Sequence, residues 1–235
     1  MVSGTRMFPS KLPIISHPLT NTSSLLFDGT DDYVESSASS AIVTGNNVTY
    51  VAWVNVNDTD VGYIMQSQKG AGSSSLALVV NQNSSLSQAD GKINAIVWSG
   101  SAHGKVEANP NLDTAGWTHV ALTTSSSAQV IYVNGVSIAT GSLTFASAAS
   151  SAAHQIGRTG GSGGNYIGAY LDEVAVFNAV LSASQVLKIY NEGKHADLSE
   201  YAGLTAWWRM EGNVRDSYGS NHGTLSGATF SVNIP

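Results

Sequence analysis

Two adjacent segments decide the fold of this chain: LDEVAVFN at residues 171–178 and VLSASQV at residues 180–186. The first is mostly apolar at both odd and even positions, which predicts a buried β-strand. The second predicts the beginning of a helix, because Ser182 is a favourable N-cap and Gln185 completes a capping box. A strand that passes directly into one short helix predicts an all-β domain with a single helix in its C-terminal third.

The helix can be followed to its end in the sequence. Leu181 and Val186 have the spacing of a hydrophobic staple. Val186, Ile189 and Tyr190 form an apolar stripe on one face. Gly193 predicts the end of the helix, because glycine readily adopts the left-handed conformation found there.

The rest of the chain predicts strands and turns. The run VTYVAWVNV at 48–56 is apolar on both faces, as expected for a central strand. Asn134-Gly135 between two apolar runs predicts a β-hairpin, and the turn at 28–32 predicts that the chain returns as the next strand. Other strand-like runs lie at 25–27, 75–80, 93–98, 117–124, 204–210 and 224–232. The stretches rich in Gly, Ser and Asn are expected to be loops or connectors: 57–74, 99–116 and 158–166.

The composition excludes several classes of function. The chain has 235 residues, no cysteine and a formal net charge of -6. Without cysteine it has no disulfide, no thiol nucleophile and no cysteine metal ligand. The ten Lys and Arg residues are scattered singly, so we expect no nucleic-acid binding. No apolar run reaches the roughly 20 residues that span a membrane, so we expect no membrane insertion.

Residues 1–24 predict an extended N-terminal arm. Pro9, Pro13 and Pro18 favour extended backbone, and the segment lacks the charged and then apolar pattern of a signal peptide. The folded domain is expected over residues 25–235. An extended arm of about 20 residues reaches far, which suits docking onto a neighbouring subunit.

A series of short motifs follows in order along the chain: LFDGTDDYV at 26–34, VAWV at 51–54, GWTHVA at 116–121, IYVNG at 131–135 and LDEVAVF at 171–177. In their order and spacing these motifs resemble the laminin-G-like, concanavalin-A-type jelly roll. The resemblance covers residues 24–235 and implies an all-β, two-sheet antiparallel sandwich. Proteins with this fold include lectins, pentraxin-like binders, adhesion modules, glucanases and viral particle proteins, so the fold leaves the function open.

The resemblance also implies a structural Ca²⁺, bound by carboxylate and carbonyl oxygens at one sheet edge. Asp28 and Asp172 occupy the matching positions. For Asp28 the alternative is equally open, since its side chain can bond the backbone of its own turn. For Asp172 the alternative is a hydrogen bond to a neighbouring strand. The weaker metal candidates are loop acids: Asp31, Asp32, Asp58 and Asp60.

Asp172 and Glu173 have the residue types of a catalytic pair, but we do not expect an enzyme. Glycoside hydrolysis requires two carboxyl groups that face one cleft. Adjacent residues of a regular strand point to opposite faces, and no residue two positions away from either is acidic. We therefore predict no catalytic residue and a structural role for Glu173.

Three residues are candidates for glycan binding: Trp98, His103 and Tyr166. Sugar sites combine an aromatic ring with polar groups, often in loops. The alternative for Trp98 is a place in the core, where tryptophan is often largely buried. His119 lies within a strand and is expected to be a structural histidine with satisfied ring nitrogens. The other tryptophans are expected in the core: Trp53, Trp117, Trp207 and Trp208.

Three functions follow from these observations, in order of preference. The first is a non-catalytic structural or adhesion module of a virion, such as a head decoration or fibre component on the virion surface. Such a module would bind neighbouring protein subunits, form homo-oligomers and bind host-surface glycans. The second is a carbohydrate-binding lectin module of a secreted, extracellular bacterial protein. The third and least favoured is a glycoside hydrolase.

Overall fold

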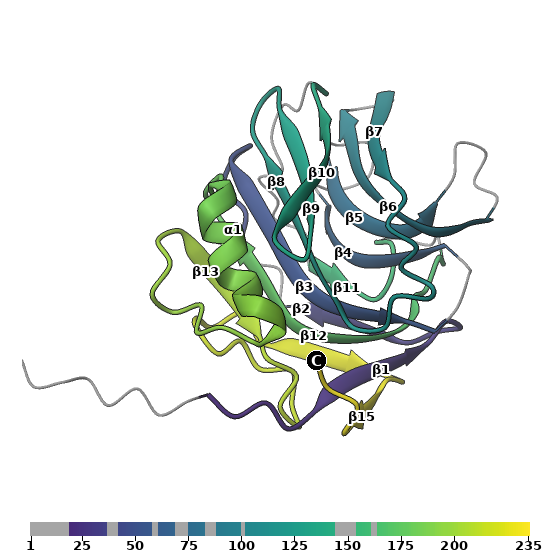
Figure 1. The fold of residues 1–235 in the computed structure, drawn as a ribbon. Coiled ribbons are helices and arrows are strands. Elements are labelled where there is room, and N and C mark those ends of the chain that lie inside the picture. The colour runs from purple at the N-terminus through teal and green to yellow at the C-terminus, as the bar shows by residue number, and fades with distance from the viewer. Residues whose placement is uncertain are drawn as a thin grey trace, which may run out of the picture.

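The computed structural model describes residues 19–36, 42–57, 61–68, 75–82, 88–99, 102–143, 154–160 and 164–235. Two antiparallel sheets lie face to face with the main apolar core between them (Figure 1). One short helix accompanies the sheets. The predicted fold class, an all-β sandwich with one helix in the C-terminal third, is confirmed.

The first sheet has eight strands in the described part of the chain. Its strands lie in the order β10 (Val136–Gly141), β9 (Gln129–Val133), β8 (Thr118–Thr124), β3 (Val48–Val56), β12 (Gly168–Phe177), β1 (Ser24–Asp28) and β15 (Thr229–Ser231). The eighth strand, β13 (Leu204–Trp208), also pairs with β12. β3 lies near the centre of this sheet and is buried along most of its length, as its apolar sequence predicts.

The second sheet has seven strands in the described residues: β14 (Gly223–Ser226), β2 (Tyr33–Ser36), β11 (His154–Ile156), β4 (Gly62–Gln68), β5 (Ser75–Gln82), β6 (Gln88–Ser99) and β7 (Ala102–Ala108). The prediction of loops at 57–74 and 99–116 is wrong where β4 and β7 lie. Hydrogen-bonded ladders to β5 and β6 hold these two strands in place, although β7 itself (AHGKVEA) has little strand propensity.

The turn at 28–32 does not form a hairpin. β1 belongs to the eight-stranded sheet, whereas β2 belongs to the seven-stranded sheet. The turn therefore carries the chain from one sheet to the other. The predicted hairpin at Asn134-Gly135 is confirmed, since it joins β9 to β10 with φ of 48° and 78°. A Cβ on Gly135 would lie 2.7 Å from Cδ1 of Leu187, so glycine also allows this turn to approach the helix.

The helix α1 (Ala183–Tyr190) lies against the outer face of the eight-stranded sheet (Figure 1). Val186 and Ile189 are buried there with Phe177 and Trp207. This second apolar cluster covers the side of the sheet that does not face the main core. Among the described residues no helix is long and apolar enough to cross a membrane.

The beginning of α1 is as predicted, and its end differs. Ser182 is the N-cap and forms the capping box with Gln185. The residue that ends α1 in the left-handed conformation is Asn191, with φ of 48°, and not Gly193. A short 3-10 turn, η1 (Asn191–Gly193), follows it.

The edge of β12 changes its neighbour halfway along. β1 pairs with residues 168–171 of β12, and β13 pairs with residues 174–177. Neither strand pairs with Asp172 or Glu173 on this edge. The interruption occurs where the chain places two acidic residues side by side.

Candidate functional site

The acid pair, Asp172 and Glu173, lies in a β-bulge of β12. The register between β12 and β3 shifts between Asp172 and Ala175, and Glu173 has φ of 50°. This left-handed conformation is uncommon for residues other than glycine and asparagine. The flanking residues Leu171 and Val174 both belong to the main core. Both acidic residues therefore lie toward the other side, the outer face of the eight-stranded sheet.

Each carboxyl group of the acid pair has its own partners. Asp172 accepts a hydrogen bond from Nδ2 of Asn21 at 2.8 Å and from the backbone N–H of Glu173 at 2.9 Å. Glu173 accepts one from the indole N–H of Trp207 at 2.5 Å and forms an ion pair with Nε of Arg209 at 3.4 Å. Asp172 is fully buried and Glu173 is 4% exposed.

Burial dominates the electrostatics of the acid pair. It raises the pKa of Asp172 to about 8, and the negative charges of Glu173 and Glu211 act in the same direction. Burial also raises the pKa of Glu173 to about 7, although Arg209 and the hydrogen bond from Trp207 oppose it. The two carboxyl groups are therefore only partly ionised near neutral pH.

Strand alternation does not separate the acid pair, contrary to the prediction from the sequence. The extra residue in the bulge brings Glu173 to the face that Asp172 already occupies. The two carboxyl groups nevertheless contact protein groups from Asn21, Trp207 and Arg209. A hydrolase needs room for substrate between its carboxyl groups, and burial leaves little here.

Two segments that run beside each other cover the acid pair: residues 19–23 before β1 and residues 209–212 after β13. The guanidinium of Arg209 donates to the carbonyl of Thr20 at 2.7 Å. The backbone N–H of Thr22 donates to the carboxylate of Glu211 at 3.0 Å. The described end of the predicted arm is thus bound to the domain, whereas residues 1–18 lie outside the described part of the chain.

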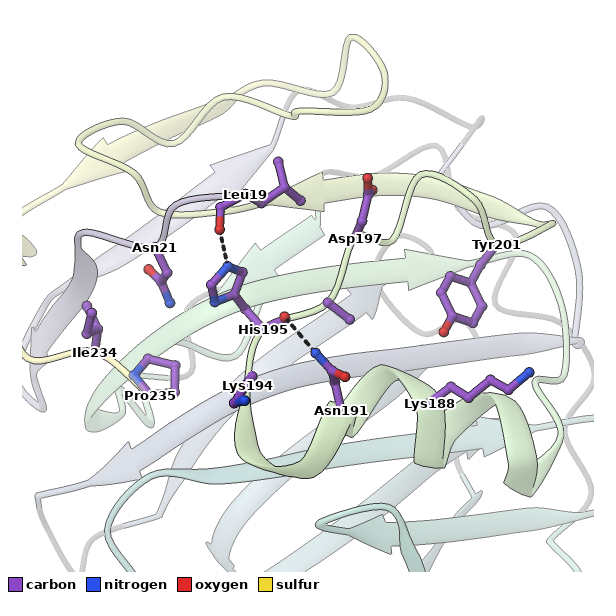
Figure 2. Close-up of a pocket in the computed structure, with 11 residues that line it drawn as sticks. Leu19, Asn21, Lys188, Asn191, Lys194, His195, Asp197, Tyr201, Ile234 and Pro235 are labelled. Carbon is purple, nitrogen blue, oxygen red and sulfur yellow. Dashed lines mark hydrogen bonds between the residues drawn. The ribbon is translucent and has the colours of Figure 1, made fainter. Parts of the chain in front are cut away.

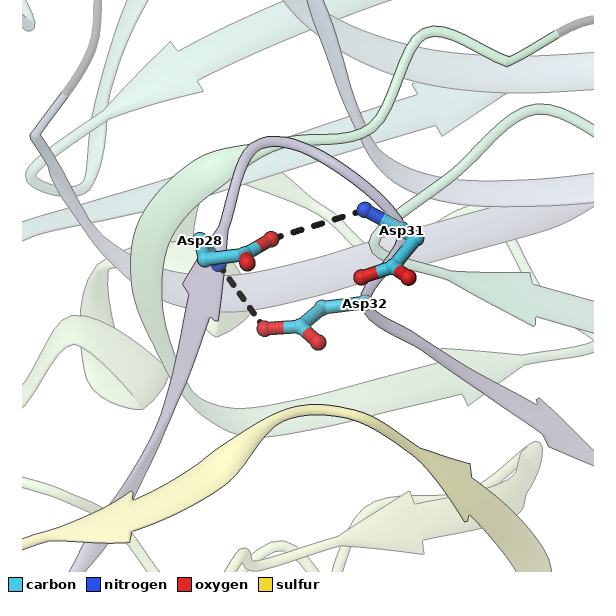
Figure 3. A group of neighbouring side chains, drawn as sticks. All are labelled: Asp28, Asp31 and Asp32. Atoms are coloured by element: carbon cyan, nitrogen blue, oxygen red, sulfur yellow. Dashed lines mark hydrogen bonds between the residues drawn. The ribbon is translucent and has the colours of Figure 1, made fainter.

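A second acidic group, the aspartate turn, consists of Asp28, Asp31 and Asp32 (Figure 3). One oxygen of each carboxylate lies within 4.8 Å of the others, so this group could hold a metal ion. Asp28 also bonds its own turn, accepting a hydrogen bond from the N–H of Thr30 at 2.8 Å. Burial raises the pKa of Asp32, against a hydrogen bond from the N–H of Asp28 and together with the charges of Asp28 and Asp31. Both predicted roles of Asp28 are compatible with this geometry.

Asp28 and Asp172, the two predicted metal ligands, do not share a site. Asp28 is opposite Gly168 in the ladder of β1 and β12. Asp172 lies four residues further along β12, about 13 Å away at 3.3 Å per residue. The acids Asp58 and Asp60 lie outside the described residues.

A row of polar side chains crosses the outer face of the seven-stranded sheet. Glu35 of β2 is directly opposite Gln155 of β11, which is directly opposite Gln66 of β4. Their neighbours in these strands face the main core: Val34, Ile156 and Met65. Because residues alternate along a strand, the three polar side chains share the outer face.

Arg158, which follows β11, lies on this row. It donates to Oε1 of Gln155 at 2.8 Å and forms an ion pair with Glu35 at 3.1 Å. Its guanidinium also stacks 3.4 Å from the ring centroid of Tyr33. The side chains of Arg158 and Glu35 remain 17% and 43% exposed. We call Glu35, Gln66, Gln155 and Arg158 the polar face cluster.

No motif in the sequence points to the polar face cluster. Arg158 lies in a stretch predicted to be a connector, and the other three residues belong to no predicted site. They are distant in the chain, and only the pairing of β2, β11 and β4 brings them together. No local pattern in the sequence predicts how these three strands pair.

The same outer face continues into an apolar region. Ala77 of β5 is next to Gln66 in the ladder, and it is buried with Ile96 and Tyr63. Trp98 packs against this apolar cluster while staying partly exposed. Trp98 therefore lies on the outer face of the sheet and not in the main core.

The three predicted glycan-binding residues are not brought together. His103 is directly opposite Trp98 in the ladder of β6 and β7, and its side chain lies outside the described part. Tyr166 lies beside the first residue of β4, whereas Trp98 is level with the last residue of that strand. The seven residues of β4 span about 20 Å, so Tyr166 lies at the other end of the sheet.

His119 is buried as predicted, but its ring is not satisfied by hydrogen bonds. It is 1% exposed, and neither ring nitrogen has a partner. The ring packs edge-on against Trp53 with centroids 5.4 Å apart, and lies 6.1 Å from the ring of Tyr190. Burial lowers the pKa of His119 to about 3, so the neutral ring serves as a packing group beneath α1.

A cavity of about 640 Å³ lies at the C-terminal end of α1 (Figure 2). We call it the helix-end cavity. Its walls include the last turn of α1, the segment after η1, and residues from both described ends of the chain, Leu19 and Pro235. A hydrogen bond between Nε2 of His195 and the carbonyl of Leu19 crosses it. None of the residues that line this cavity was predicted from the sequence to belong to a site.

The chain belongs to the concanavalin A-like lectin/glucanase superfamily. The model of the laminin G family with this description matches residues 28–187, from the aspartate turn to α1. The resemblance inferred from the motifs is confirmed at this level. No curated protein matches the chain.

Solved structures share the fold at low sequence identity. An inferred carbohydrate binding protein from Bacteroides ovatus ATCC 8483 has a TM-score of 0.68 and 21% identity, over 91% of this chain and 60% of that one. The native heptameric SAP-like pentraxin from Limulus polyphemus has a TM-score of 0.60 and 14% identity, over 89% and 94%. Domain 4 of AbnA, a GH43 extracellular arabinanase from Geobacillus stearothermophilus, has a TM-score of 0.54 and 21% identity, over 71% and 76%. At these identities the likeness shows the fold alone.

The chain spans 60% of the length of the Bacteroides protein. Neither the family description nor the three structures above concern a virion component. The preferred function from the sequence, a virion module, therefore stays a prediction.

Proposed function

We propose that the chain is a non-catalytic carbohydrate-binding module of an extracellular protein, with its glycan on the outer face of the seven-stranded sheet. The observation that carries this proposal is the polar face cluster, from which the outer face continues across β4 and β5 to the apolar region and Trp98 on β6, so that the ligand spans several sugar units. Sugars present hydroxyl groups at their edges and C–H groups on their ring faces. Their sites accordingly combine a few placed polar groups with aromatic surface.

The polar face cluster is already ordered for such contacts. Arg158 is held by Gln155 and Glu35 and by the ring of Tyr33. A guanidinium fixed in this way loses little freedom when it binds, and its remaining N–H groups can donate to two adjacent hydroxyls. The partly exposed carboxylate of Glu35 supplies an acceptor next to it.

Two of the similar structures support a carbohydrate ligand. The Bacteroides protein is an inferred carbohydrate binding protein, and the arabinanase domain is in complex with arabinotriose. A virion module of the same fold remains the second candidate, and docking onto neighbouring subunits remains its prediction. No contact among the described residues favours it over the carbohydrate-binding module.

We assign no catalysis to the acid pair. Burial and hydrogen bonds within the protein support a structural role for Asp172 and Glu173. The purified protein is expected to release no reducing sugar from β-glucans or arabinans. Turnover that disappears in Glu173→Gln while the variant stays folded would contradict this assignment.

We further propose that the aspartate turn is the calcium site of the module. Calcium takes six to eight oxygen ligands, and the turn offers three carboxylates and its own carbonyls. Millimolar Ca²⁺ is expected to raise Tm by about 2–4 °C through binding to the folded form only. Asp31→Asn should remove this shift, and Asp197→Asn, at an exposed turn elsewhere, should keep it. An equal shift in both variants would refute the assignment.

Glycan arrays followed by calorimetry test the proposed site. Arg158→Lys removes the bidentate fork and is expected to weaken glycan binding about tenfold or more. Trp98→Ala should weaken it about three- to tenfold through lost ring contact. Tyr218→Ala, at a ring 50% exposed, is the matched control and should change nothing. The proposal fails if the folded protein binds no glycan, or binds one with unchanged affinity in both site variants.

A further inference from the structure

We propose that the helix-end cavity is a second binding site, which takes an acidic sugar: a hexuronic acid unit whose carboxylate is bound by Lys194 and Lys188. This site is separate from the outer face of the seven-stranded sheet. It rests on the proposed function only in that its ligand is a saccharide. Four observations carry the inference: charge, lining, size and backbone conformation.

The first observation is the distribution of positive charge. Four of the described basic side chains pair with glutamates: Lys92, Lys105, Arg158 and Arg209. The described basic side chains outside these ion pairs are Lys188, Lys194 and Arg215, and the first two line the helix-end cavity. Two lysines that form none of these ion pairs line one cavity and can bind a carboxylate there, although Asp197 in the same lining opposes an anion.

The second observation is the rest of the lining, which suits a sugar ring. Tyr201 offers an aromatic surface, held in place by Phe177 with ring centroids 6.5 Å apart. Asn21 and Asn191 add amide groups (Figure 2). The Oδ1 atom of Asn21 is buried without a hydrogen-bond partner. A ligand hydroxyl would supply the missing donor.

The third observation is size. The cavity of about 640 Å³ lies within the range of small-ligand sites, about 300–1,000 Å³. Leu19 and Ile234 give it apolar walls, which suit the C–H faces of a sugar. A site for a bare inorganic anion would need neither this volume nor these walls.

The fourth observation is the conformation of the cavity rim. Asn191, Glu192 and Gly193 follow one another with φ of 48°, 57° and 91°. A left-handed glutamate is unfavourable, and such residues gather at ligand sites, where the surrounding structure holds them. Here the run turns the chain sharply, so that Lys188 before it and Lys194 after it line the same cavity.

Of the two lysines at the cavity, Lys194 is the better residue to substitute in a test of ligand binding. Lys188 lies in the last turn of α1, where a positive charge also stabilises the helix end. Lys194 has no such second role. Asp197 is the acid among the lining residues, and it accepts hydrogen bonds from the N–H and Oγ of Ser199 at 2.9 and 2.7 Å. Its negative charge should weaken the binding of an anion.

The segment of the chain that precedes Leu19 has the wrong charge to occupy the cavity. The segment that precedes Leu19, residues 1–18, contains Arg6 and Lys11 and no acidic residue. Like charges would oppose its insertion between two lysines. Residues 1–18 therefore supply no carboxylate to the two lysines.

Calorimetry with an oligomer of galacturonic acid tests the proposal, with the matching neutral galactose oligomer as the control ligand. The acidic oligomer is expected to bind at least tenfold more tightly, and to lose affinity as salt is added. Lys194→Ala should weaken its binding about three- to fivefold, and the double variant K188A/K194A about tenfold. Arg215→Ala removes the same charge outside the cavity and should change affinity less than twofold.

Asp197→Asn should strengthen binding, which gives a change of opposite sign within the same cavity. Equal binding of the acidic and neutral oligomers would overturn the proposal, as would unchanged affinity in K188A/K194A. Tighter, Lys194-dependent binding of a poly-glutamate peptide would also overturn it, because the occupant would then be an acidic protein segment. Thermal unfolding of each variant shows whether it is folded.

The outcome is separate from that of the proposed function. If neutral glycans fail to bind the outer face but the uronic acid oligomer binds through Lys194, the proposed site fails and the second site stands. If neutral glycans bind through Arg158 and the acidic oligomer has no preference for the cavity, the reverse holds.

Discussion

Asp216 and the acid pair are both buried acidic groups, and they differ in how many donors surround them. Asp216 is 5% exposed and accepts backbone hydrogen bonds from Trp207, Tyr218 and Gly219 on one oxygen and from Asn221 on the other, all at 3.0 Å. Burial acts to raise the pKa of Asp216, but these four bonds outweigh it and lower the pKa.

In the acid pair, burial outweighs the hydrogen bonds and the pKa values are raised. Asp172 has only two donors, and another carboxyl group is its neighbour. Burial then prevails and raises the pKa. Burial by itself therefore does not decide whether a carboxylate stabilises a fold. The number of N–H groups that point at it and the charges beside it decide this together.

The two sites should therefore give opposite pH dependence. The pKa of Asp216 is below its ordinary value of 3.8, so its contribution to stability is present above about pH 4 and is lost as the pH falls further. The acid pair has folded pKa values of about 8 and 7 against ordinary values of 3.8 and 4.5. The folded form binds more protons in that window, so its stability falls as the pH rises from about 4 to about 8.

The largest effect is expected from Asp216→Ala. The change leaves four backbone N–H groups without an acceptor in a buried loop, which should cost about 3–5 kcal/mol of unfolding free energy. Urea denaturation at pH 7 measures this cost. Asp197→Ala removes an exposed turn acid and is the matched control, with an expected cost of about 1 kcal/mol or less. Similar losses in both variants would show that the backbone bonds of Asp216 do not matter.

Glu173→Ala is expected to come next. It leaves the guanidinium of Arg209 and the indole N–H of Trp207 without their shared acceptor, which should cost about 2–3 kcal/mol at pH 6. Glu173→Gln keeps an oxygen for one of these donors and should cost about half as much. If the two variants were equally stable, hydrogen bonding would not be the way in which Glu173 stabilises the fold.

The effect of Asp172→Asn on stability is expected to depend on pH. At pH 8.5 it removes a buried negative charge and should stabilise the fold by about 1–2 kcal/mol. At pH 5 the native carboxyl group is already protonated, so the change should be nearly neutral. A turn of the Asn21 amide would place its unpaired Oδ1 against the new N–H. Denaturation midpoints at both pH values test this, and destabilisation that is the same at both would contradict it.

Asn21→Ala should have the smallest effect. It removes one donor to Asp172 together with an acceptor that has no partner, so the two losses nearly cancel at about 0.5 kcal/mol. Because the donor favours the ionised form, the variant should become relatively less stable above pH 8. A loss of several kcal/mol would mean that residues 19–23 are essential to the fold.

Local signals account for the parts of the fold that the sequence predicted. The capping box of Ser182 and Gln185 and the hairpin at Asn134-Gly135 involve residues within four positions of each other, so their conformations follow from short-range bonds and sterics. β3 was predictable for a similar reason, since a strand covered on both faces is apolar throughout. The end of α1 was misplaced because both Asn191 and Gly193 accept the left-handed conformation.

The site residues depended on contacts that local signals do not carry. Alternation along β12 was the correct rule for a regular strand, but it failed at Glu173, where the neighbouring strand changes from β1 to β13. The polar face cluster required the register of three strands far apart in the chain. His119 was correctly expected in the interior, whereas its lack of a partner depends on what packs around it.

The sequence by itself determined the class of fold, the helix capped by Ser182, the buried strand at 48–56 and the absence of cysteine chemistry. These properties depend on composition and on interactions between residues close in the chain. The tertiary structure decided where Asp172 and Glu173 point, how many donors surround Asp216, and which four side chains form the polar face cluster. The physical reason is that the pKa of a buried acid and the make-up of a binding surface depend on neighbours in space, which strands distant in sequence supply.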